Sequence, residues 1–172
     1  ELIVGTPWYF PIGDVEDYAK CQDENIAGLL SSGVRYLDIR VSNGWRKSMA
    51  YPNTMADGSY GRIYIHHTML FIALDIAMNK IANFLDSTAH EILILDFQSL
   101  TKEACNPDIG RKIHEQVVNR LQSYGIVTQA SPTDSLLKIR QKGRVFLIMD
   151  DSDLKSLQLP AEDAKKWYTR SK

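Results

Sequence analysis

Tyr36, Asp38 and Arg40 alternate with apolar residues in the run 33–41, which is otherwise typical of a buried strand. Side chains at positions i and i+2 of a strand point to the same face, so these three polar groups share one side. A guanidinium that is always charged suits the oxygens of an anion such as phosphate. The pattern therefore indicates an anion-binding site at Asp38 and Arg40. A buried salt bridge without a ligand is the alternative that the spacing leaves open.

Two further expected strands also end in polar side chains. His66 and His67 close the strand expected over 62–66, and Asp96 lies near the end of the strand expected over 91–97. Taken singly, such residues are more often structural, because a strand-end Asp commonly forms a turn or caps a helix. Together they favour a site, since barrel enzymes place their active sites at the carboxyl ends of successive parallel strands.

A metal centre is not expected. His66 and His67 are adjacent, so in a strand they point to opposite faces and cannot easily share one zinc ion. Asp38 and Asp96 would supply two carboxylates to Mg²⁺ or Ca²⁺, but Arg40 then stands where the cation should be. Serine-hydrolase and phosphate-loop motifs are absent from the sequence. We therefore expect neither a metal nor another cofactor.

Strand-like and helix-like patterns alternate along the chain. Expected strands span 2–5, 35–41, 62–66, 91–97 and 144–149, and expected helices span 23–32, 68–86, 108–124 and 135–141. A last helix is expected in the tail around Lys165 to Arg170, and His114 is expected on a helix surface without partners. This alternation predicts an α/β fold with a parallel sheet covered by helices.

The composition limits the classes of function. The chain has 172 residues, 44% of them hydrophobic, and a net charge of −1. One domain is expected, and a nucleic-acid partner is not, because no element carries a basic stripe. The first residue is Glu1 and no signal-peptide pattern follows, which indicates a processed or trimmed N-terminus. Cys21 and Cys105 are equally compatible with one disulfide in a secreted protein and with two buried thiols. A secreted location is the expectation, and a cytoplasmic location is the alternative.

Several of these segments resemble the X region of phosphatidylinositol-specific phospholipase C (PI-PLC) proteins. The resemblance runs through 22–26, 33–41, 65–67, 91–97 and 143–148, and its most specific parts are the Leu-Asp-Ile-Arg and His-His elements. It is strongest toward the X-domain-only eukaryotic proteins and the metal-independent bacterial enzymes. It implies an incomplete TIM barrel of about five strands, with 1–172 as a single X-domain-like unit that lacks the second half of the barrel.

The resemblance also implies phosphodiester chemistry. In the family, one histidine is the general base on the inositol 2-hydroxyl, a second protonates the leaving diacylglycerol oxygen, and an arginine stabilises the charge at phosphorus. Arg40 matches that arginine, Asp38 its aspartate partner, and His67 the general acid. The other residues expected to contact the substrate or its phosphate are Asp96, Gln98 and His66.

Two features depart from the family pattern. The family's first histidine lies in a Gly-Thr-His-Asp-Ser turn, where this chain has Pro7 after Gly5 and Thr6, and Thr68 replaces the glycine after the second histidine. Loss of a general base typically costs about 10²–10⁴-fold in rate. A complete barrel also needs about 250 residues, so the missing strands are expected from a second chain, from another copy, or from a part that was removed.

Three functions are consistent with this pattern. The first is a catalytically degenerate X-like protein that binds a phosphorylated headgroup, either an inositol phosphate or a phospholipid. The second is an active phosphodiesterase of lipid metabolism whose base is His66, Asp96 or a partner's residue. The third is a non-catalytic secreted scaffold or effector. The aromatic run at 8–10 would allow contact with a membrane surface, although packing across the barrel mouth is the favoured interpretation.

Overall fold

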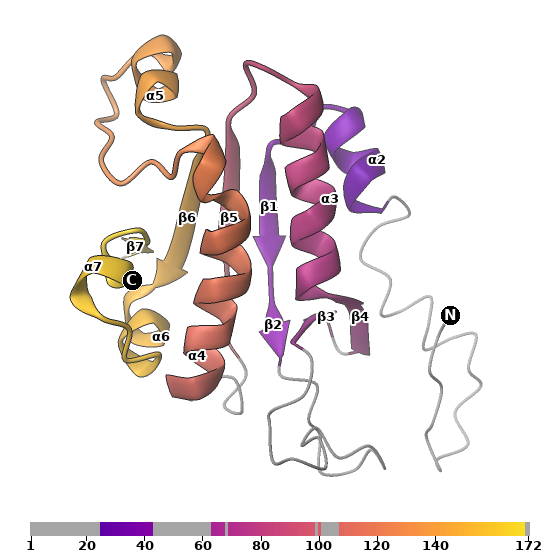
Figure 1. Ribbon diagram of the computed structural model, residues 1–172, viewed down its shortest axis with the longest axis vertical. Coiled ribbons are helices and arrows are strands. Elements are labelled where there is room, and N and C mark those ends of the chain that lie inside the picture. The colour runs from indigo at the N-terminus through magenta and orange to yellow at the C-terminus, as the bar shows by residue number, and fades with distance from the viewer. Residues whose placement is uncertain (1–24, 43–62, 68, 99, 101–106, 171–172) are drawn as a thin grey trace.

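A four-stranded parallel sheet forms the centre of the molecule. The computed structural model describes residues 25–42, 63–67, 69–98, 100 and 107–170. The sheet order is β1-β5-β6-β7, as Figure 1 shows for its first three strands. These strands span Tyr36–Ile39 (β1), Leu93–Phe97 (β5), Val145–Asp150 (β6) and Tyr168–Arg170 (β7). All three pairings are parallel, which confirms the expected fold class.

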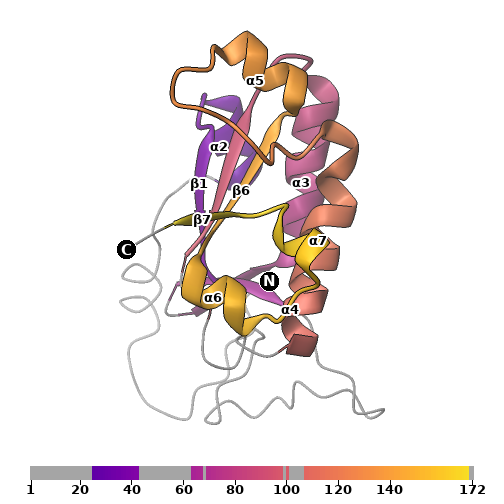
Figure 2. The ribbon, with the colours of Figure 1, turned by 90° about the vertical axis from the view of Figure 1, so that its left-hand side faces the viewer.

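One face of this sheet is packed against helices. Its inward side chains are apolar and buried: Leu37, Ile39, Leu93, Leu95, Phe97, Val145, Leu147 and Met149. Helices α3 (Leu74–Ser87) and α4 (Pro107–His114) lie on this side, as the two perpendicular views in Figures 1 and 2 show. Burial of these alternating positions is the main force that holds the strands in register, because a one-residue slip would expose the whole set. The opposite face carries Tyr36, Asp38 and Asp96 and is therefore the face available for chemistry.

A second, antiparallel sheet lies at the carboxyl end of β1. It consists of β2 (Val41–Ser42), β3 (Tyr64–His67) and β4 (Met69–Ala73). The expected helix 68–86 is therefore wrong in its first turns, because 69–73 pairs with β3 and the helix begins only at Leu74. An apolar run of this length suits a strand as well as a helix, and the pairing with β3 decided between them.

The segment 107–124 is helical but not one regular helix. After α4 it continues as a π-helical turn, Glu115–Asn119, and as a 3₁₀ turn, Gln122–Tyr124, before Gly125 ends it with φ of 77°. Two shorter helices flank the other strands: α2 (Ile26–Ser31) precedes β1, and α5 (Leu136–Lys142) precedes β6. Helical structure is thus present within the expected helices 23–32, 108–124 and 135–141, and the strand 144–149 is present with its ends shifted by one residue.

The tail differs from expectation. Instead of one last helix, it contains α6 (Asp151–Ser156), α7 (Ala161–Ala164) and then β7, which joins the sheet beside β6. The reason is Trp167, which is only 5% exposed and places its ring edge-on to Phe97 at 5.2 Å between centroids. Burial of this ring directs the following residues onto the sheet edge.

Some expectations lie outside the described residues. These are the strand 2–5, the turn with Pro7, the aromatic run 8–10, Cys21, Thr68 and Cys105. Within the described ranges, no helix is long and apolar enough to cross a membrane.

Candidate functional site

Asp38 and Arg40 form an accessible ion pair at the end of β1. The Nη2 atom of Arg40 lies 3.7 Å from Oδ2 of Asp38, and each side chain is 41% exposed. At this distance the contact is electrostatic rather than a hydrogen bond. The pair is thus not the buried salt bridge that the sequence left open as an alternative. Its exposure leaves the guanidinium within reach of a dissolved or lipid-bound anion.

Asp96 lies on the neighbouring strand in a different environment. Parallel pairing of β1 with β5 sets Asp38 directly opposite Asp96. The Asp96 residue is only 2% exposed, and its Oδ2 accepts a hydrogen bond from the Tyr36 hydroxyl. The same oxygen accepts a second bond from Nε2 of Gln98, at 3.3 Å. The structure therefore brings together four polar residues that the sequence placed on two separate strands.

Tyr36 is the member of this group for which no role was predicted from the sequence. The i, i+2 spacing placed it on the face of Asp38, which was a correct prediction, but nothing in the spacing showed that its hydroxyl reaches Asp96. That contact joins residues 60 positions apart and depends on the parallel β1–β5 register. Tyr36 is 49% exposed, so its ring borders the site while its hydroxyl fixes the Asp96 carboxylate.

The two histidines lie on a strand that reaches the site by an antiparallel connection. His66 and His67 are the last residues of β3. Val41, the residue after Arg40, pairs with Ile65 on this strand. Their strand is therefore antiparallel to β2, and the expectation of three successive parallel strands is wrong for the histidine strand. The pairing still sets the backbone of β3 beside the chain that leaves Arg40.

An ion pair with a structural role lies at the opposite end of β1 and β5. Nε of Arg35 is 2.6 Å from Oε2 of Glu91, and the Arg35 side chain also donates to the backbone oxygens of Leu30 and Val34. The hydrogen bond from Arg35 lowers the pKa of the Glu91 carboxyl below its usual value. These contacts join the amino ends of the two strands and leave the carboxyl ends for the site.

His114 is another residue whose prediction was wrong. It was expected on a helix surface, but it is 6% exposed and lies against the tail. Trp167 Nε1 donates to its Nδ1 at 3.1 Å, and its Nε2 is 3.2 Å from Oδ1 of Asp163. No local pattern could predict these contacts, because Trp167 follows His114 by 53 positions.

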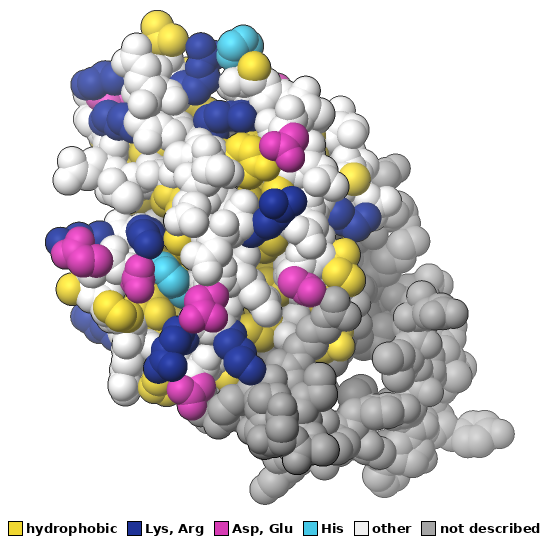
Figure 3. Space-filling model, in the orientation of Figure 1, with side chains coloured by type: hydrophobic (Ala, Val, Ile, Leu, Met, Phe, Trp, Pro, Cys, Tyr) yellow, Lys and Arg dark blue, Asp and Glu magenta, His cyan; other side chains and the backbone are white. Residues whose placement is uncertain are grey.

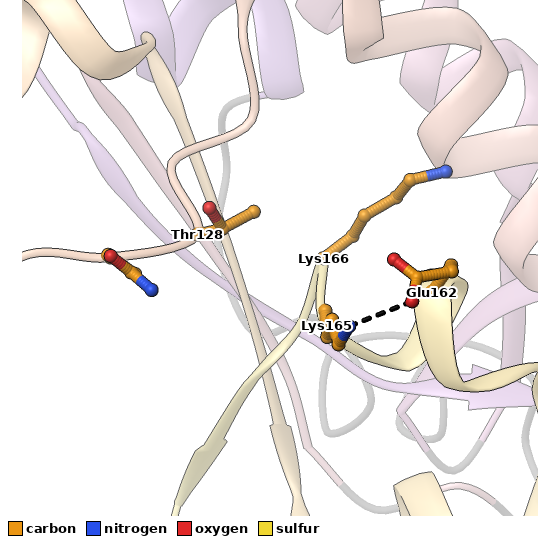
Figure 4. Close-up of a pocket in the computed structure, with 5 residues that line it drawn as sticks. Thr128, Glu162, Lys165 and Lys166 are labelled. Carbon is orange, nitrogen blue, oxygen red and sulfur yellow. Dashed lines mark hydrogen bonds and ion pairs between the residues drawn. The ribbon is translucent and has the colours of Figure 1, made fainter.

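A hollow in the surface lies away from the Asp38–Arg40 pair. It measures about 390 Å³ and is lined by Thr128, Gln129, Glu162, Lys165 and Lys166 (Figure 4). Lys165 is bonded to Glu162 at 2.8 Å and Lys166 to Asp163 at 3.0 Å, so acidic neighbours already balance both cations. Figure 3 likewise shows acidic and basic side chains interspersed on the visible face rather than gathered in one patch.

The described residues do not form a metal site. In the part of the chain that the structure describes, no three His, Cys, Asp or Glu side chains are grouped so that they would hold a metal ion. The candidate site therefore consists, among the described residues, of the Arg40 guanidinium, two carboxylates, the Gln98 amide and the Tyr36 hydroxyl.

Comparisons with known proteins find similarity to phospholipases C and to a PI-PLC X domain-containing protein. The chain is 26% identical over 144 residues to the variant-surface-glycoprotein phospholipase C of Trypanosoma brucei brucei, covering 82% of this chain and 36% of the relative. It is 30% identical over 82 residues to a PI-PLC X domain-containing protein of Dictyostelium discoideum, covering 48% of this chain and 12% of the relative. The phosphatidylinositol-specific phospholipase C of Staphylococcus aureus superposes with a TM-score of 0.53 at 19% identity, over 83% of this chain and 43% of that one.

The chain is thus similar in sequence to phospholipases C and to a PI-PLC X domain-containing protein. Its fold is that of part of a TIM-like barrel, with four parallel strands in the described residues. No family model matches the chain. The chain spans about a third of the length of the trypanosome relative that it matches.

Proposed function

We propose that this PI-PLC X-like chain binds a phosphorylated headgroup, either an inositol phosphate or a phospholipid, with little or no turnover. The observation that carries the proposal is the half-exposed Arg40 guanidinium beside Asp38, at the carboxyl ends of the parallel strands. A planar guanidinium donates to two phosphate oxygens at once, and a carboxylate beside it limits its orientations. Ligands of α/β barrels bind at this end of the strands.

Neighbouring side chains extend the proposed site. Asp96 lies on the adjacent strand β5 and Gln98 directly follows that strand; they supply a carboxylate and an amide, groups that bind the hydroxyls of a polyol such as inositol. The trypanosome and S. aureus proteins are phospholipases C by name, which supports a phospholipid or its headgroup as the ligand class. Weak turnover is proposed because Pro7 stands where the family has its first histidine. Proline has no side-chain group that accepts a proton.

An active phosphodiesterase is the second candidate. The observation that favours it is the buried Asp96 carboxylate, which lies opposite Asp38 on the same face and is oriented by Tyr36. In this alternative, Asp96 or His66 removes the proton from the attacking hydroxyl, and His67 protonates the leaving oxygen. Each transfer needs the group within hydrogen-bond reach of the substrate.

Binding is tested first, by calorimetry with inositol 1-phosphate and by sedimentation with vesicles that contain phosphatidylinositol. We expect Arg40→Ala to weaken binding at least about tenfold. Arg111→Ala is the matched control, because Arg111 also lies 3.7 Å from an aspartate, Asp108, but on the surface of α4. Equal binding by Arg40→Ala and the wild type would overturn the proposal.

Turnover is tested separately, by hydrolysis of phosphatidylinositol micelles with EDTA or with Ca²⁺. Headgroup binding without release of inositol phosphate supports the first function. Metal-independent release of a cyclic inositol phosphate that is lost in His67→Ala supports the second. A folded chain that neither binds nor hydrolyses would leave the scaffold function. Recovery of activity in Pro7→His would show that the missing base is the cause of weak turnover.

A further inference from the structure

We propose that His114 is a pH-sensitive latch that fastens the tail segment 161–170 to helix α4. The imidazole lies at the end of α4 and bridges two tail residues. Nδ1 accepts the indole N–H of Trp167 at 3.1 Å, and Nε2 lies 3.2 Å from Oδ1 of Asp163. Because an indole nitrogen only donates, Nδ1 must be the acceptor, and the proton therefore resides on Nε2, where it is donated to Asp163. This arrangement requires the neutral imidazole.

Protonation would break one of the two contacts. An imidazolium carries a proton on Nδ1 as well, and that N–H would face the N–H of Trp167 without an acceptor between them. It would also place a charge on a residue that is 6% exposed. The neutral ring thus fits both partners, whereas the charged ring fits only Asp163.

The charged groups around the imidazole act in both directions. Asp163 attracts a proton to the ring, whereas Lys166, from the same tail segment, repels it. Glu115, the next residue on the helix side, adds a weaker attraction. Asp163 Oδ1 also accepts a hydrogen bond from Lys166 Nζ at 3.0 Å, so the negative charge of Asp163 acts on both His114 and Lys166. Burial is the largest influence, and the pKa of His114 is lowered from its ordinary value of 6.5.

The latch holds the edge of the sheet. Trp167 is 5% exposed and contacts Phe97 of β5 edge-on, and β7 follows it directly. Figure 2 shows α7 and β7 as one continuous segment that crosses from the helix side to the sheet. β7 pairs with β6 through only three residue pairs. The Lys165–Glu162 pair is exposed and contributes little. Trp167, against Phe97, and Tyr168, whose ring lies 5.6 Å from that of Phe146, therefore anchor this segment.

The sign of the pH dependence follows from these contacts. In the undocked or unfolded chain His114 takes up a proton near pH 6.5, whereas in the docked state it does so at lower pH. Between these two values the undocked state binds more protons, so docking weakens as the pH falls below about 6.5. Below the folded-state pKa no further loss is expected. Acidification therefore weakens the docking of the tail segment against the edge of β6.

Hydrogen exchange of the full chain at pH 7.5 and 5.5, corrected for intrinsic rates, tests the latch. We expect the protection of 161–170 to fall at least about threefold at the lower pH. His114→Gln should remove most of this response, because its amide presents an oxygen to Trp167 and an N–H to Asp163 without titrating. His90→Gln, which changes an exposed histidine before β5, should behave as the wild type.

A second variant separates the hydrogen bond from the packing. Trp167→Phe keeps an aromatic ring on Phe97 but lacks the indole N–H. We expect its tail at pH 7.5 to exchange nearly as fast as the wild-type tail at pH 5.5. The latch is overturned if His114→Gln retains the full wild-type response, or if wild-type protection is equal at the two pH values. Should His114→Gln fail to fold, an imidazole midpoint at or above pH 6.5 in the wild type, measured by NMR, would overturn it equally.

Discussion

Asp38 and Asp96 are register partners on neighbouring parallel strands, yet they lie in opposite environments. Asp38 is 41% exposed beside Arg40, whereas Asp96 is buried and accepts hydrogen bonds from Tyr36 and Gln98. Partner residues on adjacent strands are separated by about 4.8 Å. The two carboxylates therefore lie side by side but differ in their surroundings. Asp38 faces solvent and the Arg40 guanidinium, whereas Asp96 is held in place by its hydrogen bonds to Tyr36 and Gln98.

Replacement of Asp96 should destabilise the fold more than replacement of Asp38. In Asp96→Asn a neutral amide oxygen replaces the charged oxygen that accepts from both Tyr36 and Gln98, so both hydrogen bonds weaken, and an NH₂ group takes the place of the other carboxylate oxygen at this buried position. This costs about 1–3 kcal/mol of unfolding free energy. Asp38→Asn, at an exposed position, should stay within about 0.5 kcal/mol of the wild type. Urea unfolding measures both, and equal losses would contradict the assignment of Asp96 as the buried member.

The shared face of the site could be predicted from the sequence, but its contacts could not. Period-two alternation fixes which side chains of one strand lie together, so Tyr36 and Asp38 were placed correctly on one face. Arg40 lies between β1 and β2, and its guanidinium is 3.7 Å from Asp38. The position of Asp96 opposite Asp38 depends on how two distant strands align, which the pattern of either strand alone does not contain. The direction of the histidine strand depends in the same way on its pairing with β2.

The largest errors concern segments whose partners are distant in sequence. The run 69–73 is apolar enough for either a helix or a strand, and pairing with β3 made it a strand. The tail around Trp167 has a helical composition, but burial of the indole between Phe97 and His114 directs it onto the sheet. In both cases tertiary contacts overrode the local pattern.

Arg144 should be among the most sensitive positions for stability. Its guanidinium donates to the backbone oxygens of Leu85, Thr88 and Glu91, which end α3 and lead into β5. Arg144→Lys keeps the charge but cannot reach three separate acceptors, so we expect a loss of about 3 kcal/mol. Arg140→Ala, on the nearby helix α5, is the control and should change stability by less than about 0.5 kcal/mol. Similar thermal midpoints for the two variants would show that these carbonyl oxygens accept hydrogen bonds from other donors when Arg144 is replaced.

The acid stability of the chain should depend on Asp134. Its carboxylate accepts from Lys138 at 2.6 Å, Lys142 at 2.8 Å and the backbone N–H of Ser131 at 3.1 Å. The two lysines hold the pKa of this carboxyl well below its ordinary value of 3.8. A depressed pKa stabilises the folded state above the unfolded-state value, and this contribution is lost as the pH falls through the folded-state value.

The Asp134→Asn variant isolates that contribution. The difference in unfolding free energy between it and the wild type should be constant above about pH 5 and should shrink as the pH falls below about 4. Urea titrations at a series of pH values between 2.5 and 7 give this difference directly. A difference that stays constant down to the lowest pH would mean that folding does not lower the pKa of the Asp134 carboxyl.

Charge competition at Arg40 is the prediction that bears most directly on the proposed function. Asp38 lies 3.7 Å from the guanidinium, and both side chains are 41% exposed. A phosphate that approaches Arg40 therefore meets a negative charge at short range, whose repulsion is worth up to about 1 kcal/mol in water. Asp38→Asn removes the repulsion and keeps the side-chain shape, so we expect about threefold tighter binding of inositol 1-phosphate.

Salt and a matched variant distinguish this effect from others. The increase in affinity of Asp38→Asn for inositol 1-phosphate should become smaller in high salt, because exposed charges are screened. Asp108→Asn removes a carboxylate at the same 3.7 Å from Arg111 and should leave binding unchanged. A double variant with Arg40→Ala should bind as weakly as Arg40→Ala alone, since the repulsion acts on a ligand that the guanidinium holds. If Asp38→Asn instead weakens binding as much as Arg40→Ala does, the carboxylate positions the guanidinium, and that positioning outweighs its repulsion of the phosphate.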